Sequence, residues 1–287
     1  MNTKNYLSIY AKSFNWSGFF LPKKIYYKCS VLYDFCRTID NIADQNKDLE
    51  IKKKELEEFR KKFEQKDKND SVIKNMWNLM SERNISKKIV DDLFDGVNSD
   101  LKKEVRIETE KELLIYSYRV AGTVGLMMAK IFGVKKKESL QRAIDLGIAM
   151  QLTNIARDVV EDEKKNRVYL IKSSNDVFKS IQNIILKADS FYDSSFEGIR
   201  DIPLNSRFSI IVARRVYRQI GKKILDKKNI KNYKKSGKIY VSNFGKIIQT
   251  LFSLKDFIIL FFLKEKKYEK ELEYNLISED IGLNERI

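Results

Sequence analysis

The stretch of sequence that decides the fold and the site is QLTNIARDVVEDEKKNRVYL, residues 151–170. Its apolar positions have helical spacing, in which side chains three and four positions apart lie above one another. One face of this helix carries a row of oxygen-bearing side chains, namely Gln151, Asn154, Asp158 and Asp162. The other face carries apolar side chains that can pack, namely Leu152, Ile155, Ala156 and Val159. The pattern therefore predicts a helix that packs on one side and presents oxygen ligands on the other.

The polar row of this helix has the chemistry of a divalent-cation site. Two aspartates four positions apart repel each other, at roughly 0.2–0.5 kcal/mol in an isolated helix. Carboxylate and amide oxygens suit Mg²⁺, which takes one or two carboxylates and leaves its other positions to water or phosphate oxygens. Arg167 and Tyr169 follow a polar run, where a loop can close over an anion. The row thus predicts a bound cation with an anionic ligand beside it.

Spacing alone does not single out a site, because 33% of the residues are charged. The same aspartate spacing recurs at Asp40/Asp44, Asp44/Asp48, Asp91/Asp95 and Asp189/Asp193. One further group has the right neighbours, on a helix expected from Lys23 to Ala43; it comprises Arg37, Asp40, Asn41 and Asp44. The alternative for that group is a solvated network between Arg37 and the polar side chains after it, worth under about 1 kcal/mol.

The composition favours an all-α protein with one domain over residues 1–287. A chain of this length, 43% hydrophobic, can bury a full core. Its 2 prolines and 11 glycines are too few for the turns of a many-stranded sandwich. Helical periodicity predicts a short segment before residue 24 and further helices over 23–43, 45–70, 71–104 (two), 108–132, 137–160 continuing into the opening stretch, 176–225 (two) and 244–263.

The absence of histidine excludes several classes of site. The 287 residues contain no histidine, so Ser-His-Asp catalysis, Cys-His catalysis and histidine-containing zinc sites are ruled out. The two cysteines, Cys29 and Cys36, cannot form a four-thiolate site. They lie two helical turns apart, and we expect reduced core residues in a cytoplasmic protein, because a disulfide framework needs more cysteines.

The net charge of +16 indicates an anionic partner, which leaves nucleic acid, anionic lipid and a phosphorylated substrate as candidates. Lysines are scattered and not gathered on one recognition helix, so we expect no nucleic acid partner. No signal peptide is apparent. The apolar run within 251–263 is shorter than the roughly 20 residues that span a bilayer. Residues 244–263 are expected to form a basic amphipathic helix that either docks on the protein or lies in a membrane interface.

Small residues interrupt the helix predicted over 108–132. Ala121, Gly122 and Gly125 form a smooth patch, although each glycine weakens a helix by roughly 1 kcal/mol. Such a patch indicates close approach by another helix or by a ligand. Together with Val120 and Val124 it would suit a long hydrocarbon, and tight helix packing explains it equally well. The two acidic rows, facing each other across a bundle, would hold a diphosphate through Mg²⁺, with an apolar tunnel for its hydrocarbon chain.

Four segments together resemble the squalene/phytoene synthase family, the head-to-head prenyl transferases. They are SFNWSGFFLP (13–22), YDFCRTIDNIAD (33–44), YSYRVAGTVGLMM (116–128) and QLTNIARDVVEDEKKNRVYL (151–170). Weaker similarity is found at DGVNSDL (95–101), ARRVY (213–217) and GKIYVS (237–242). The segments follow the family's order and cover about residues 10–245, which leaves a basic tail over about 244–287. The second aspartate motif, through to Arg-x-Tyr, is the most specific of them.

The resemblance implies an all-α isoprenoid-synthase bundle around a central cavity. It assigns Mg²⁺ binding, with Mn²⁺ as an alternative, to Asp40, Asp44, Asn154, Asp158 and Asp162. It assigns contacts with the diphosphates to Arg37, Arg157, Arg167, Tyr169 and Tyr217. Further substrate-binding positions are Ser13, Tyr116, Gln151 and Lys238, and the hydrocarbon channel is expected at Val120, Val124 and Gly125.

The implied reaction joins two prenyl diphosphates through a cyclopropylcarbinyl diphosphate intermediate. Phytoene from two geranylgeranyl diphosphates is the first expectation, and squalene or dehydrosqualene from farnesyl diphosphate is the alternative. NADPH is needed only if the product is squalene. Two further alternatives are a catalytically inactive assembly factor and a basic nucleic-acid-binding helical protein. We expect a monomer, cytoplasmic or peripheral on the inner face of the membrane.

The sequence departs from the family pattern at three positions. Asn41 replaces a usual aspartate, Ala11 replaces a polar residue, and Lys238 replaces a common arginine, which keeps the charge and loses the two-pronged hydrogen bonding of a guanidinium. The outer aspartates of both motifs are present, so we expect an active enzyme. In the absence of histidine, the proton acceptor is expected to be released diphosphate or a tyrosine such as Tyr217.

Overall fold

The helix that carries the first acidic row starts directly after a proline. Pro22 precedes α3 (Lys23–Asp44), where its fixed φ and missing N–H are tolerated because the first turn of a helix lacks backbone partners. Leu32, Phe35 and Ile39 lie on the buried face of α3, and each is almost fully excluded from solvent. Their burial turns the polar side chains of the same helix toward the neighbouring elements. The helix predicted from Lys23 is thus confirmed.

The computed structural model describes residues 12–171, 176–264 and 266–287, and side chains from residue 15 onward. The further α-helices in these ranges are α2 (Lys12–Gly18), α4 (Leu49–Glu64), α5 (Ser71–Arg83), α6 (Lys87–Ser99), α7 (Glu110–Ser117), α8 (Thr123–Ile131), α9 (Lys137–Lys164), α10 (Val177–Gly198), α11 (Leu204–Leu225), α12 (Ile230–Lys235), α13 (Asn243–Phe262) and α14 (Glu271–Ile281). Shorter elements are the strands β1 (Val105–Arg106) and β2 (Arg167–Val168), the π-helical turn η1 (Tyr118–Gly122), and the 3-10 turns η2 (Ile199–Asp201) and η3 (Leu283–Glu285).

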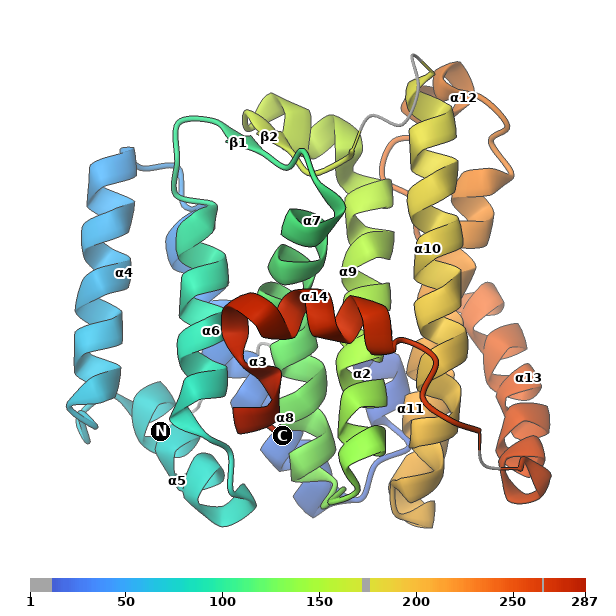
Figure 1. Ribbon diagram of the computed structural model, residues 1–287, viewed down its shortest axis with the longest axis horizontal. Helices are drawn as coiled ribbons and strands as arrows, with labels where there is room; N and C mark the ends of the chain where they lie inside the picture. The colour runs from blue at the N-terminus through green and yellow to red at the C-terminus, as the bar shows by residue number, and fades with distance from the viewer. Residues whose placement is uncertain (1–11, 172–175, 265) are drawn as a thin grey trace.

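The long helices stand side by side, with α9 in the middle of the bundle (Figure 1). This helix packs against α8, α10, α11 and η1. The short parallel pair β1–β2 lies at one end of the bundle, where α9 ends, and α14 crosses the front of the helices. At the two sides of the view lie α4 and α13. The all-α architecture expected from the sequence is confirmed.

Glycines allow α8 and η1 to approach α9 very closely. A Cβ atom at Gly125 would lie 2.2 Å from the backbone oxygen of Ala143, and one at Gly147 would lie 2.2 Å from that of Ala121. Real Cβ atoms do not come this close to an oxygen, so only glycine fits at both positions. The small patch predicted from the sequence is therefore a helix contact. Val120, Val124 and Gly125 also line an internal cavity, so the two interpretations hold together.

Three features of the fold were not predicted. The segment 108–132, expected as one helix, is divided into α7, η1 and α8, because the backbone widens to a π-helical turn at Tyr118–Gly122. The short helix α12 and the strands β1 and β2 were not expected either. The basic tail also contains α14, whose acidic residues interrupt its apolar positions in the sequence.

Buried polar contacts fix the tail to the bundle. The Asp145 carboxylate on α9 accepts hydrogen bonds from Ser194 Oγ at 2.6 Å and Tyr268 Oη at 2.9 Å. Arg286 donates to both carboxylate oxygens of Asp92, at 3.0 and 3.1 Å. Such charge-assisted bonds in buried surroundings are among the stronger ones in proteins. The tail of this protein is therefore part of the bundle.

Both cysteines lie on α3 and are free thiols, as the sequence predicts. Burial raises the pKa of Cys29 to about 12, so this thiol stays protonated and unreactive. Within the described part of the chain, none of the helices combines the length and apolar character needed to cross a bilayer.

The contact between α8 and α9 predicts a sharp difference between two glycines. Gly147→Ala should lower the free energy of unfolding by about 1–3 kcal/mol, because the added methyl meets backbone atoms that cannot rotate away. The matched control is Gly221→Ala on α11, where the nearest atom is a side-chain methyl at 3.2 Å. That variant should stay within about 1 kcal/mol of wild type, because alanine favours the helix. Urea unfolding measures both, and equal stabilities of the two variants would contradict the close contact.

Candidate active site

Five aspartates line one cavity, of about 330 Å³, at the end of the bundle near β1 and β2; we call it the acidic cavity. Asp40 and Asp44 come from α3 and Asp158 and Asp162 from α9, while Asp100 directly follows α6. The two acidic rows predicted from the sequence therefore face the same cavity. Other sequence-predicted residues that line it are Tyr116, Val120, Gln151, Asn154, Arg157, Arg167, Tyr169 and Lys238.

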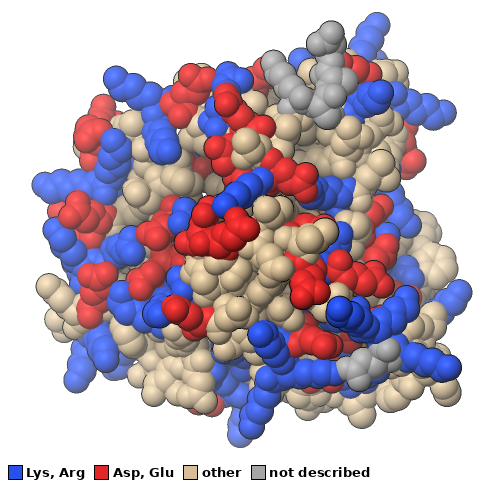
Figure 2. All heavy atoms as spheres, viewed as in Figure 1, with Lys and Arg blue, Asp and Glu red and all other residues tan. Residues whose placement is uncertain are grey.

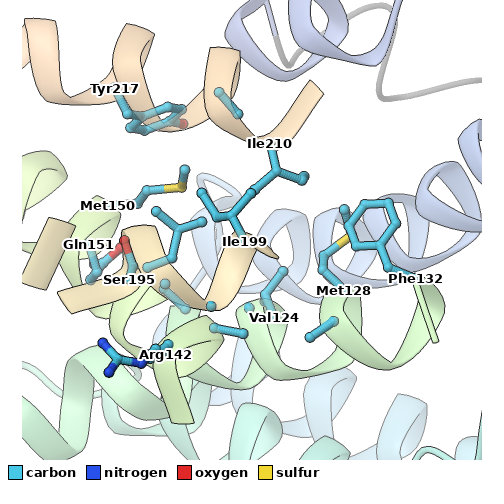
Figure 3. A pocket seen from close by; sticks show the side chains of 18 of the residues that line it. Val124, Met128, Phe132, Arg142, Met150, Gln151, Ser195, Ile199, Ile210 and Tyr217 are labelled. Carbon is cyan, nitrogen blue, oxygen red and sulfur yellow. The ribbon is translucent and has the colours of Figure 1, made fainter. Parts of the chain in front are cut away.

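A second cavity, of about 290 Å³, adjoins the first and is largely apolar; we call it the apolar cavity. Figure 3 shows its side chains, with Tyr217, Met150 and Gln151 toward one side and Met128 and Phe132 toward the other. Four residues line both cavities, namely Asp40, Val120, Gln151 and Asn154. A ligand with an anionic head and a hydrocarbon chain could therefore occupy both at once.

Basic side chains already engage the carboxylates of α9. Arg157 donates to both oxygens of Asp158, from Nε at 2.8 Å and from a terminal nitrogen at 2.6 Å. The Lys238 ammonium lies 3.3 Å from the same carboxylate. Lys238 is thus placed at the cavity although the guanidinium common in the family is missing. The cations offset part of the repulsion between Asp158 and Asp162, which would otherwise oppose this arrangement.

The strand β2 brings a second basic group over the opposite wall. Val105 and Arg106 pair with Arg167 and Val168 in parallel, which fixes the backbone just after α9. From there, an Arg167 guanidinium nitrogen reaches Asp44 Oδ1 at 3.3 Å, and the Lys165 ammonium lies at the same distance from that oxygen. The chain after α9 therefore crosses to α3 and closes the rim of the acidic cavity, as the polar run in the sequence suggested.

Asp100 is a site residue that sequence reasoning did not identify. Its carboxylate accepts hydrogen bonds from Tyr116 Oη at 3.0 Å and Tyr169 Oη at 2.6 Å. The two tyrosine rings stack, with centroids 4.7 Å apart and planes at 15°. Burial raises the pKa of Asp100, against the lowering effects of the Tyr169 hydrogen bond and the Arg167 charge. The only signal for it was the weak similarity of residues 95–101 to the family.

Burial and mutual repulsion shift the carboxyl groups of both rows. The Asp40 side chain is exposed to the cavity, yet desolvation by the surrounding protein raises its pKa to about 7, opposed by the charge of Arg37 and helped by that of Asp44. Desolvation likewise raises the pKa of Asp162 to about 7, and the charge of Asp158 adds to the shift. Bound cations would stabilise the ionised form of these carboxyl groups, so the cavity attracts cations.

The donor atoms of the acidic cavity fit a divalent cation. Among the described residues, Asn154 Oδ1 is buried and has no hydrogen-bond partner, so an oxygen ligand is left available beside Asp158. No three acidic or cysteine side chains in these ranges converge on one metal position. Carboxylates spread over two walls match the coordination of Mg²⁺-like ions, which take one or two protein ligands and complete their shell with phosphate oxygens or water.

The remaining predicted residues lie in different places. Tyr217 on α11 lines the apolar cavity, and burial raises its pKa, so its hydroxyl is protonated at neutral pH. Arg37 is one turn before Asp40 on α3 and is not among the residues that line either cavity. The side chain of Ser13 lies outside the described residues. Asn154 donates a long hydrogen bond of 3.4 Å to Gln151 Oε1, so these two amides form one polar edge between the cavities.

Comparison with solved structures identifies the fold. The crystal structure of a dehydrosqualene synthase in complex with a ligand superposes with a TM-score of 0.71 and 26% identity, over 87% of this chain and 93% of that chain. The squalene synthase HpnC from Alicyclobacillus acidocaldarius superposes with a TM-score of 0.63 and 19% identity, over 79% of this chain and 91% of that one. The fold is therefore the all-α bundle of the isoprenoid synthases.

Within that class, the chain belongs to the squalene/phytoene synthase family, whose model matches residues 8–171, more than half of the sequence. The 15-cis-phytoene synthase of Enterobacter agglomerans is 39% identical over 139 residues, which are 42% of this chain and 47% of that protein. The chloroplastic phytoene synthase of Daucus carota is 30% identical over 239 residues, 74% of this chain and 59% of that protein. The match thus spans about half the length of the bacterial relative.

The raised pKa of Asp162 predicts how stability depends on pH in the absence of divalent cations. The folded protein holds this proton up to about pH 7, whereas the ordinary pKa is 3.8, so the folded state is favoured at low pH and loses stability as pH rises toward 7. Asp162→Asn should flatten this fall and weaken the stabilisation by added divalent cation. Thermal unfolding from about pH 5 to 8, with chelator or cation, measures both effects.

The control for this experiment is Asp145→Asn on the same helix. Burial raises the pKa of Asp145 to about 7 as well, so this variant should also flatten the pH dependence. Asp145 does not line the acidic cavity, so the response to divalent cation should remain. If both variants kept the full cation response, the assignment of Asp162 to a cation site would be wrong.

Proposed function

We propose that this protein condenses two prenyl diphosphates head to head, through a cyclopropylcarbinyl diphosphate intermediate. The observation that carries the proposal is the junction of the acidic cavity with the apolar cavity along Asp40, Val120, Gln151 and Asn154. A prenyl diphosphate has the same division into a polyanionic head and an apolar chain. The junction would hold the carbon–oxygen bond that must break between the two.

The diphosphate groups would bind between the acidic rows, with Mg²⁺ as the cation and Mn²⁺ as an alternative. Asp40 and Asp44 would hold the metal from α3, and Asn154, Asp158 and Asp162 would hold it from α9. When bound, the metal ions neutralise diphosphate and make it a better leaving group. Arg157, Arg167, Lys165 and Lys238 surround the same cavity and would take up the remaining negative charge. Tyr116 and Tyr169, held by Asp100, would close the cavity beside β2.

In the first half of the reaction, the carbon–oxygen bond of one substrate breaks, and diphosphate departs with the electron pair. The double bond of the second substrate attacks the allylic cation, and loss of one proton forms the cyclopropane ring. In the second half, the remaining carbon–oxygen bond breaks, releasing the second diphosphate, and the cation rearranges to the 1–1′ linked skeleton. Loss of a second proton gives phytoene or dehydrosqualene, whereas hydride from NADPH would give squalene.

Tyr217 would shield the cation rather than act as a base. Its phenol is protonated, because burial raises its pKa, and it lies in the apolar cavity with Tyr33, whose pKa burial raises to about 12. The π faces of such neutral rings attract cations, by about 2 kcal/mol or more where water is excluded. Departed diphosphate, held in the acidic cavity, is then the stronger base at hand. Of the two proton acceptors expected from the sequence, the raised pKa favours diphosphate.

Phytoene from geranylgeranyl diphosphate is the product we propose. Bacterial and plant relatives of this chain are phytoene synthases, which supports the longer substrate. A structural neighbour at 26% identity is a dehydrosqualene synthase, so farnesyl diphosphate is the specific alternative. The apolar wall farthest from Tyr217, with Met128 and Phe132, would set the chain length (Figure 3).

The direct test is incubation of the purified protein with Mg²⁺ and each prenyl diphosphate in turn, with and without NADPH, followed by analysis of the hydrocarbon. We expect phytoene from geranylgeranyl diphosphate without any nicotinamide cofactor. Dehydrosqualene or squalene alone would transfer the assignment to farnesyl diphosphate. If no substrate gave a hydrocarbon or a cyclopropyl intermediate, an enzymatic role would be refuted, and the alternative of a catalytically inactive family member would hold.

In the same assay, Asp158→Ala should reduce turnover by at least about a hundredfold, because it removes a carboxylate from the proposed cation site. The matched control is Asp189→Ala on α10, from a pair with identical spacing. Asp189 accepts a hydrogen bond from Arg218 Nε at 2.7 Å and lines neither cavity. This control should leave turnover unchanged. Normal turnover in Asp158→Ala would remove α9 from the cation site.

A further inference from the structure

The helix α13 packs on the bundle with polar side chains on its inner side. Asp256 is buried and accepts two hydrogen bonds from Arg215 on α11, one of them at 2.8 Å. Thr250 Oγ1 accepts from Trp16 Nε1 at 3.0 Å, and Ser253 is fully buried. These polar side chains occupy positions that an ordinary surface helix fills with leucine and valine. The helix therefore contacts the protein through these hydrogen bonds as well as through the buried Leu260 and the ring contact of Phe257 with Phe208.

The opposite side of α13 is exposed and apolar; we call it the outer face. Its side chains recur at intervals of three and four positions along the whole helix, namely Phe244, Ile247, Leu251, Leu254, Ile258 and Phe261. Phe262, at the end of the helix, is 82% exposed. Lys255 is the only charged side chain exposed on α13, which the structure describes throughout. A continuous apolar stripe of this length is unusual on a protein surface and marks a contact with something apolar.

Aromatic side chains extend the outer face beyond the N-terminal end of α13. The turn between α2 and α3 presents Phe19, which is 85% exposed, next to Trp16 and Phe20. These residues share a surface cavity with Asn243 and Lys246 of α13. Trp16 combines an apolar ring with a hydrogen-bonded indole nitrogen, a type of residue enriched where a protein meets the interface of a bilayer.

Basic residues border the outer face. Lys264, Lys266 and Lys267 follow α13 and are exposed, and Lys23 and Lys24 are exposed at the start of α3. Figure 2 shows basic side chains gathered at the lower right, where the chain leaves α13 in Figure 1. An apolar face bordered by lysines fits a partner surface that has an apolar interior and negative charges around the contact. A second copy of the chain would bring like charges together at the same border.

We propose that the outer face of α13, with the aromatic turn at Phe19, binds the surface of a bilayer that contains anionic lipid. The helix lies in the plane of the interface, with its apolar side chains among the acyl chains and the lysines at the headgroups. None of the described helices can cross a bilayer, so the contact is peripheral. The inference extends the proposed function, because prenyl diphosphates and their hydrocarbon products partition into membranes.

The test is flotation of the full chain with vesicles of phosphatidylcholine, with or without roughly one third phosphatidylglycerol. The wild-type protein should float with the anionic vesicles and be released in part by high salt. Leu254→Glu with Ile258→Glu should lower binding by about tenfold or more, because both charges would enter the apolar region. The control is Leu272→Glu, at a leucine of α14 that is 79% exposed and lies off the outer face; it should bind like wild type.

Unchanged binding of the double variant, or no binding by wild type, would refute the proposal. Sedimentation without lipid tests whether a second copy of the chain covers the outer face instead. A dimeric wild-type protein and a monomeric double variant would show that the outer face joins two copies and would contradict the proposal. Circular dichroism confirms that the variants are folded. Activity in detergent separates this inference from the proposed function, because Asp158→Ala should float normally, whereas the double variant should turn over substrate normally.

Discussion

The constraint that shapes the site is the mutual repulsion of carboxyl groups in the acidic cavity, which the basic side chains beside them offset only in part. Six carboxyl groups, those of five aspartates and of Glu161, line one cavity at the end of a helical bundle, and at Asp40 and Asp162 desolvation raises the pKa to about 7. Basic side chains offset part of this charge: Arg157 and Lys238 pair with Asp158, Lys238 also pairs with Glu161, and Arg167 pairs with Asp44. A site of this kind stabilises bound cations and, through them, an anion that none of the carboxylates could hold alone.

The packing of α8 against α9 gives this electrostatic site its apolar partner. Glycines at positions 125 and 147 let the two backbones approach closely, and the side chains beside them, such as Val124 and Met128, turn into the apolar cavity. The acidic row of α9 thus begins where the apolar wall ends. The division of the substrate into head and chain is matched by one helix that is polar in its last turns and apolar earlier.

Much of the site was predictable from helical spacing together with the residues that neighbour each aspartate pair. Side chains three and four apart share a face, so the rows at Asp40/Asp44 and at Asp158/Asp162 could be placed before the structure was known. Asp100 could not, because its role comes from two tyrosines that reach it from α7 and from beyond β2, and no local pattern records such a meeting. The π-helical turn at Tyr118–Gly122, which divides the expected helix, was likewise not indicated by any local pattern.

Helix α13 shows a different limit of sequence reasoning. Its length and amphipathic character were predicted, but periodicity does not tell which face turns inward. The structure turns the polar face to the bundle, because Arg215 supplies a partner for Asp256, and leaves the apolar face outside. Of the two expectations for this helix, docking on the protein holds for its polar face, and contact of its apolar face with a membrane is our proposal.

The central claim is that the two acidic rows bind one diphosphate through divalent cations. A crystal structure with Mg²⁺ and an unreactive thiolodiphosphate analogue of geranylgeranyl diphosphate tests it most directly. The account predicts metal-bridged diphosphate oxygens between α3 and α9, with the prenyl chain beside Val124 and Met128. A diphosphate bound by lysines elsewhere on the surface, with Asp40 and Asp158 left without metal, would contradict it.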